Sequence, residues 1–150
     1  MNTRSFLLSA LIAGALLGTL ANLPLLNFFN CFLCLWVWLG GILAVYLYNR
    51  YEHGPANLTV GQGAGVGAVA GLIGALVGTV VYALTSFITA PLMSQVASAL
   101  NVDMPTQEGG PWVAFGLVIF FLIVNLILYP IFGAIGGLLG AGVFWKKAEA

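Results

Sequence analysis

Two cysteines separated by two residues are the first candidates for chemistry in this sequence. Cys31 and Cys34 form a Cys-x-x-Cys motif at the start of an apolar stretch. A structural zinc site takes four ligands, and the single histidine, His53, falls in a polar segment on the opposite side of the predicted membrane. A disulfide is compatible with an oxidising compartment, although positions i and i+3 of a regular helix fit disulfide geometry poorly. The remaining interpretations are a candidate redox pair and two small packing residues.

Asn125 is the second candidate, because its amide lies inside a long apolar stretch, five residues before Pro130. An amide in hydrocarbon needs a partner, and interhelical hydrogen bonds from such side chains contribute about 0.6–2 kcal/mol. Pro130 lacks an N–H, so it frees the carbonyl of Leu126 and is expected to kink its helix. Asn125 and Pro130 are therefore either a structural clip or the lining of a site for a small ligand or ion.

Charged side chains are absent from the apolar stretches. The chain has four Lys and Arg and four Asp and Glu, and all eight fall in short polar segments. Proton- or cation-coupled transporters usually keep such residues inside the helix bundle. Intramembrane hydrolysis would need a His–Ser pair, paired Asp residues or a His-Glu-x-x-His metal site. We predict that the protein is not an enzyme and has no catalytic residue, no metal site and no cofactor.

The rest of the composition agrees with this low number of charges. The chain has 150 residues, of which 61% are hydrophobic and 5% charged, whereas about a quarter of the residues in a soluble domain are charged. Four apolar stretches cover approximately residues 5–22, 30–49, 62–89 and 112–145. A spanning helix needs about 20 mostly apolar residues, and the alternation typical of membrane barrels is missing. The sequence predicts one all-α, polytopic domain over residues 1–150, with four transmembrane helices.

The basic residues predict the orientation of these helices. With four spans, both termini and the segment 49–60 lie on one side, and this side holds Arg4, Arg50, Lys146 and Lys147. Basic residues in short flanking segments mark the cytoplasmic side. We therefore expect both termini in the cytoplasm.

Glycines recur at helical spacing in the predicted spans. In lipid no hydrophobic force drives helices together, so rows of small residues let their backbones approach and gain packing contacts. A phosphate-binding loop would instead need a preceding strand and a Lys followed by Ser or Thr, which this sequence lacks. We predict close helix contacts, within the chain or between copies, at Gly14, Gly18, Gly63, Gly67, Gly71, Gly74, Gly78, Gly133, Gly137 and Gly140.

The two halves of the chain resemble each other. Segment 14–20 reappears as segment 74–80, and the pair Gly40-Gly41 matches Gly136-Gly137, although glycine-rich apolar helices also match by chance. A true duplication predicts two similar hairpins of one orientation, related by an axis along the membrane normal. The expected result is a pseudo-twofold four-helix bundle.

The connection between the third and fourth spans has a separate pattern. From Pro91 to Asn101, apolar residues recur on one face of a helix, with Ser94, Gln95 and Ser98 opposite. We interpret residues 91–101 as a short helix in the outer membrane interface. The alternative is a solvated loop.

Two stretches carry a family resemblance. One leads from Leu25-Leu26-Asn27 into Cys31-Phe32-Leu33-Cys34-Leu35-Trp36, and the other runs from Thr59 through Gly61-Gln62-Gly63-Ala64 to Ala75. They are similar to a group of uncharacterised small bacterial membrane proteins with four spans, and the similarity covers about half of the chain. The resemblance implies a bacterial inner (cytoplasmic) membrane and four spans, and it implies no functional residues.

These observations favour a non-enzymatic role in assembly. The expected protein is a structural or accessory subunit of a larger membrane complex or homo-oligomer. Its partners are the lipid bilayer and other membrane subunits or copies of itself, with no nucleic acid. One alternative is a small oligomeric channel or uncoupled permeation pathway around Asn125 and Pro130. Another is a lipid- or pigment-binding subunit, since the tryptophans and tyrosines near the predicted helix ends can line a pocket as well as anchor at headgroup level.

Overall fold

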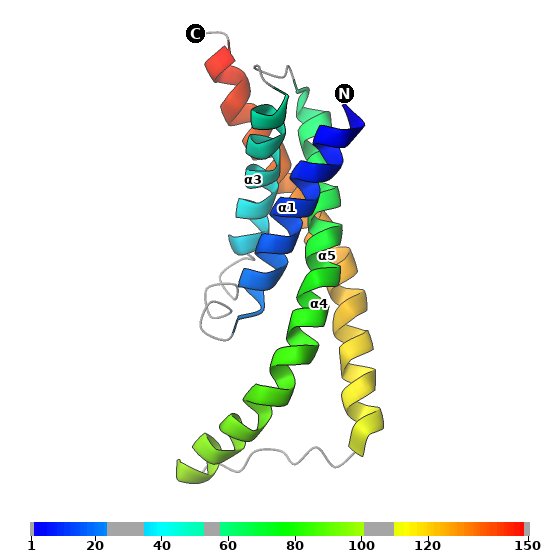
Figure 1. Ribbon diagram of the computed structural model, residues 1–150, viewed down its shortest axis with the longest axis vertical. Coiled ribbons are helices and arrows are strands. Elements are labelled where there is room, and N and C mark those ends of the chain that lie inside the picture. The colour runs from blue at the N-terminus through cyan, green and yellow to red at the C-terminus, as the bar shows by residue number, and fades with distance from the viewer. Residues whose placement is uncertain (1, 24–34, 53–57, 101–109, 149–150) are drawn as a thin grey trace.

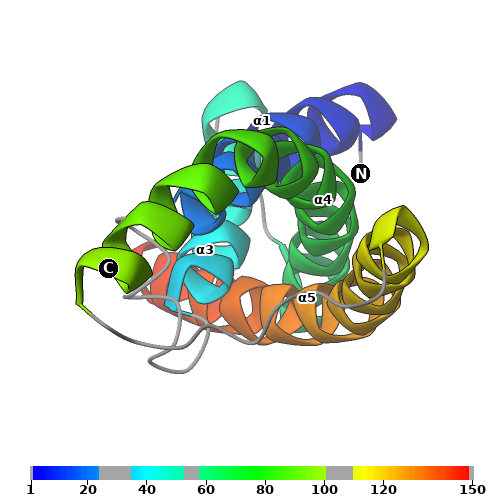
Figure 2. The ribbon, with the colours of Figure 1, turned by 90° about the horizontal axis from the view of Figure 1, so that it is seen from below.

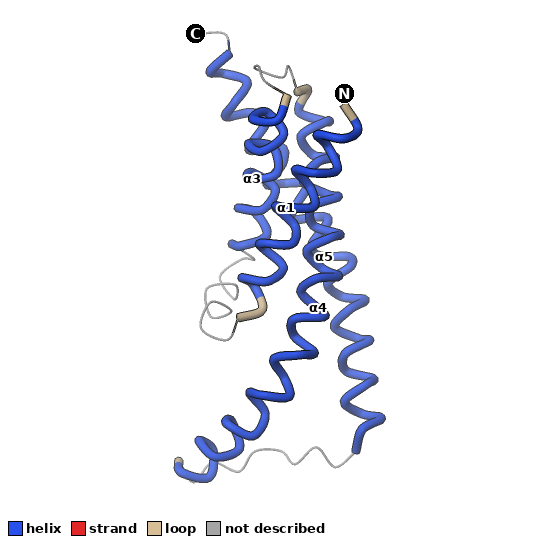
Figure 3. The backbone as a smooth tube through the Cα atoms, viewed as in Figure 1, coloured by secondary structure: helices blue, strands red, loops and turns tan. Residues whose placement is uncertain are grey.

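Every regular element in the part of the chain that the structure describes is an α-helix (Figure 3). The computed structural model describes residues 2–23, 35–52, 58–100 and 110–148. Its helices are α1 (Thr3–Ala21), α3 (Leu35–Tyr51), α4 (Val60–Ala99) and α5 (Gly110–Ala148) (Figure 1). The predicted all-α fold is confirmed for these residues.

Three of these helices are long and apolar enough to cross a membrane. They are α1, the segment Val60–Ser86 of α4 and the segment Phe115–Val143 of α5, with mean hydropathies of 1.6, 2.1 and 2.6. Together with the small number of charges, they indicate an integral membrane protein. Helix α3 has 17 residues, and the span predicted at 30–49 begins in residues that lie outside the described ranges.

Side chains near the start of α1 and α4 stabilise these helices. Asn2 accepts a hydrogen bond from the Arg4 N–H at 3.2 Å. Thr59 and Gln62 form a capping box, in which each side chain accepts a hydrogen bond from the other residue's backbone N–H, at 3.3 and 3.0 Å. A threonine cap of this kind contributes about 1 kcal/mol, so the boundary at Thr59 has a clear physical cause.

Helix α4 continues without a break through Pro91 to Ala99. The prediction of a separate interfacial helix at 91–101 is therefore wrong in its boundary: residues 91–99 are helical, but they belong to α4. A proline removes only one backbone donor, so it leaves one carbonyl of the preceding turn without its helical partner and does not by itself end the helix. The far part of α4 leans away from α5 (Figure 1).

The four helices form a ring in the order α1, α4, α5, α3, with α3 also touching α4 across it (Figure 2). A twofold axis along the bundle would exchange α1 with α4 and α3 with α5. A contact of α3 with α4 would then require one of α1 with α5, and these two described helices do not touch. The expected pseudo-twofold bundle is not present, because the two helices that resemble each other pack side by side.

All four basic residues lie at one end of the bundle. The start of α1, the end of α3, the start of α4 and the end of α5 share this end (Figure 1). Arg4 belongs to the first turn of α1 and Arg50 to the last turn of α3, while Lys146 and Lys147 belong to the last turn of α5. The alternating helix directions therefore gather the positive charge on one side.

Small residues make up most of the core, whereas many large apolar side chains point outward. The larger core cluster contains Ala10, Ala13, Ala44, Val45, Tyr48, Leu58, Val66, Ala70 and Ala141. By contrast, Leu11, Val80 and Leu84 are 56%, 59% and 63% exposed. Lipid tails are as apolar as leucine, so such a surface suits a bilayer and leaves the interior to residues that allow close packing.

Candidate functional site

The contact between α4 and α5 brings backbone against backbone. A Cβ added to Gly67 would meet the carbonyl of Gly133, with Gly137 Cα at 3.0 Å, and one added to Gly63 would lie 2.7 Å from the Gly137 carbonyl oxygen. One turn further along, Gly71 lies against the carbonyl of Tyr129. These glycines recur at intervals of four residues on two antiparallel helices, so the two backbones touch over three turns.

A second contact of this kind joins α1 to α4, which run in the same direction. A Cβ on Gly14 would meet the carbonyl of Ala70, and one on Gly18 would meet the backbone of Gly74. In return, a Cβ on Gly74 would lie 3.3 Å from the Gly14 carbonyl oxygen. The glycines of the two similar segments 14–20 and 74–80 thus pack on one another.

The same arrangement joins α3 to α5. A Cβ on Gly41 would meet the backbones of Gly133, Gly136 and Gly137, and one on Gly136 would meet the backbone of Trp38. Gly140 leaves slightly more room, with Ile42 Cα at 3.1 Å from its added Cβ. Gly41 of the first glycine pair therefore packs against the backbone of the second pair, Gly136-Gly137.

Asn22 is a contact residue that the sequence analysis did not single out. It follows the last residue of α1, and its side-chain amide donates a hydrogen bond to the Gly18 carbonyl at 2.8 Å. A Cβ on Gly78 of α4 would collide with this amide. A polar residue directly after a helix end, in register with Gly14 and Gly18, was the available signal.

Not every glycine lies in a contact. An added Cβ would have open space at Gly61 and Gly65 of α4 and at Gly116 and Gly142 of α5. Gly65 lies between Gly63 and Gly67 in the sequence, yet it faces away from both contacts. Spacing alone does not separate these two kinds of glycine. The side of a helix that faces another helix is set by how the helices pack together.

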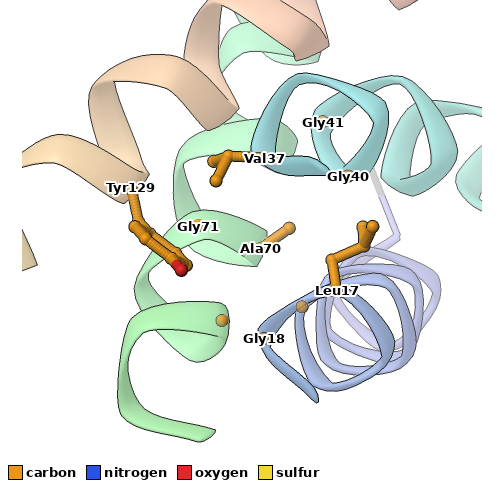
Figure 4. Close-up of a pocket in the computed structure, with 10 residues that line it drawn as sticks. Leu17, Gly18, Val37, Gly40, Gly41, Ala70, Gly71 and Tyr129 are labelled. Carbon is orange, nitrogen blue, oxygen red and sulfur yellow. The ribbon is translucent and has the colours of Figure 1, made fainter. Parts of the chain in front are cut away.

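A small cavity lies where all four helices meet (Figure 4). Its volume is about 10 Å³, which is room for about one water molecule. The lining is apolar apart from one tyrosine and consists of Gly14, Leu17, Gly18, Val37, Gly40, Gly41, Ala70, Gly71, Gly74 and Tyr129. This space is too small for a pigment, a quinone or a substrate, and it is a packing defect between glycine-lined helices.

Asn125 and Pro130 lie in α5, which continues through both residues. Tyr129, directly before Pro130, is 7% exposed and lines the cavity. Asn125 is half-buried one turn away and is not among the lining residues. The structure therefore does not bring the amide of Asn125 to this cavity, and the proline contributes backbone surface against Gly71, whose added Cβ would lie 2.9 Å from Pro130 Cα.

Polar contacts gather near the basic end of the bundle. The Tyr48 side chain is 2% exposed and lies beside the side chain of Glu52 and the backbone of Asn2. Ser9 is fully buried, and its hydroxyl donates to the Phe6 carbonyl at 3.0 Å. Among the described residues, no three His, Cys, Asp or Glu side chains lie close enough together to hold a metal ion. The candidate redox pair Cys31 and Cys34 lies outside the described residues.

No family model, no curated protein and no solved structure matches this chain.

Proposed function

We propose that the protein is a non-enzymatic structural or accessory subunit, which packs with other subunits in the membrane. The observation that carries this proposal is the use of its glycines: three helix pairs touch through their backbones, and the cavity lined by residues of all four described helices has room for about one water molecule. Such contacts make a rigid apolar body. The outward surface of this body is then the part that can pack against other subunits.

The proposed placement in the membrane has four spans, with α3 as the second. The end that carries Arg4, Arg50, Lys146 and Lys147 lies in the cytoplasm, because positively charged segments stay on that side. The membrane in question is proposed to be a bacterial inner membrane, on the resemblance described above.

A labelling experiment tests this orientation. In a Cys31→Ser, Cys34→Ser background, Ala148→Cys is expected to resist a membrane-impermeant maleimide added to intact cells, whereas Leu100→Cys is expected to react. Both positions are helix ends, and Leu100 is 68% exposed. Labelling at position 148 from outside the cell would contradict the orientation.

Gentle purification tests the role itself. We expect the protein from its native membrane to run as an assembly, with other membrane proteins or copies of itself in fixed ratio. In vesicles, the purified protein is expected to carry no ion or solute flux, and its absorption spectrum is expected to show protein bands only. A flux that Asn125→Leu abolishes would establish a permeation pathway instead, and a visible absorption band would establish a pigment carrier.

A further inference from the structure

Positive charge lies at the surface of the basic end, whereas negative charge is turned inward. Arg4, in the first turn of α1, and Arg50, in the last turn of α3, are both exposed. Glu52 is the only acidic residue in the described part of the chain. One of its carboxyl oxygens, Oε2, is buried without a hydrogen-bond partner, and its side chain lies beside the buried Tyr48. The two arginines therefore face the surroundings of the protein, while the carboxyl group is partly withdrawn from them.

The two arginines belong to helix ends that touch each other. Helices α1 and α3 are neighbours in the ring, and the backbone of Asn2 lies beside the Tyr48 side chain. Arg4 follows Asn2 by two residues, and Arg50 follows Tyr48 by two residues. Helix α4 begins at the same end with Val60, and its first turn is uncharged. The positive charge is thus distributed unevenly around the ring, on α1, α3 and α5 but not on α4.

Each arginine also lies at the end of an outward face that suits lipid chains. On α1, the exposed Leu11 follows Arg4 by seven residues, and on α3, the exposed Tyr46 and Leu39 precede Arg50 by four and eleven residues. These spacings place the side chains on the face of their arginine. The rise from Leu39 to Arg50 is about 16.5 Å, close to one leaflet, which is half of a hydrocarbon core of about 30 Å. A lipid on this face would have its chains at Leu39 and its headgroup at Arg50.

We infer that these faces of α1 and α3 bind an anionic phospholipid selectively, with its headgroup phosphate at Arg4 and Arg50 and its chains along Leu11 and Leu39. Basic residues next to the ends of transmembrane helices attract anionic lipids, and the planar guanidinium group matches the oxygens of a phosphate. The ligand is a lipid and not a soluble anion, because each arginine continues into an apolar face. This inference depends on the membrane location and not on the accessory role, so it goes beyond the proposed function.

The lipids that stay bound to the protein test this inference. The protein is reconstituted in vesicles of phosphatidylglycerol and phosphatidylcholine with identical chains and extracted gently, and the retained lipids are quantified by mass spectrometry. The parent is expected to retain phosphatidylglycerol in excess of its share in the vesicles. Arg4→Gln combined with Arg50→Gln is expected to lower the ratio of the two retained lipids about fivefold or more. A parent ratio equal to that of the vesicles, or an unchanged ratio in the double variant, would overturn the inference.

Two control variants separate this site from a general attraction between basic residues and anionic lipid. Lys146→Gln combined with Lys147→Gln removes the same charge from the end of α5, and it is expected to keep most of the preference, because extraction removes loosely attracted lipid. Arg50→Gln combined with Val60→Arg keeps the net charge and moves one positive charge to an exposed position at the start of α4. It is expected to lose as much preference as Arg50→Gln alone. A full loss in the lysine variant, or recovery in the relocated variant, would show that net charge selects the lipid and would overturn the inference.

A competition experiment distinguishes a lipid from free phosphate. Inorganic phosphate, added to the extracted protein at constant ionic strength, is expected to leave the retained phosphatidylglycerol in place, because it makes no contact with Leu11 or Leu39. Displacement by inorganic phosphate would show a site for soluble anions and would overturn the inference. Arg4 and Arg50 are exposed, so their glutamine variants are expected to unfold at the same midpoint as the parent, which separates lost lipid from lost structure.

Discussion

Gly67→Leu is expected to lower the free energy of unfolding by about 3 kcal/mol or more. The atoms that a Cβ at this position would meet are the carbonyl of Gly133 and the Cα of Gly137. Both belong to the backbone of α5, so no side chain can rotate away. The two helices must separate, and that separation also opens the neighbouring contacts at Gly63 and Gly71. Denaturant or thermal unfolding of the purified protein in detergent measures the loss.

The control for this substitution is Gly65→Leu. Gly65 belongs to the same helix, two residues away, and an added Cβ there meets nothing within 4 Å. Leucine is a better helix former than glycine by about 0.5–1 kcal/mol, so the variant is expected to be as stable as the parent or slightly more stable. If both variants lost the same stability, the cause would be glycine content and not the contact with α5.

The second large effect is expected from Gly41→Ala, which should cost about 2–3 kcal/mol. The added methyl group would meet three residues of the α5 backbone, with Gly137 N at 2.6 Å and the Gly136 carbonyl carbon at 2.8 Å. Because even the smallest side chain is too large here, α3 and α5 must move apart. A lower unfolding midpoint, with an unchanged helical circular dichroism spectrum at low temperature, is the expected measurement.

Gly40→Ala is the matched control, since the two glycines are neighbours and both line the small cavity. The three atoms nearest to a Cβ at Gly40 all belong to the side chain of Leu17, and the nearest is its terminal Cδ1. A leucine side chain can adopt another rotamer, so the cost is expected to stay below about 1 kcal/mol. A loss at Gly40 equal to that at Gly41 would show that backbone contact is not what distinguishes them.

The structure offers a second explanation for the similarity between segments of the two halves. Gly14 and Gly18 of α1 pack against α4 at Ala70 and Gly74, and Gly41 of α3 packs against Gly133 and Gly137 of α5. Two helices that meet closely both need small residues along the line where they meet. Mutual contact is thus sufficient to explain why these segments resemble each other, with or without a duplication.

The amino-acid sequence by itself determined the class of the protein. Apolar stretches with few charges predict helices, because only helices and closed barrels satisfy their own backbone hydrogen bonds in lipid, and the described residues are helical. The helix starts at Asn2 and Thr59 are local as well, since caps act over three residues. Glycine spacing marked Gly63, Gly67 and Gly71, which the structure places against α5.

Only the tertiary structure decided which helices meet. It placed α1 beside α4, joined residues 91–99 to α4 and turned Gly65 away from the contact that Gly67 makes. It also placed Tyr129, and not Asn125, at the central cavity. The physical reason is that side-chain spacing fixes the faces of one helix, whereas the choice of neighbour depends on the shapes of all four helices together. In lipid, where any apolar face is tolerated, that choice leaves little trace in the sequence.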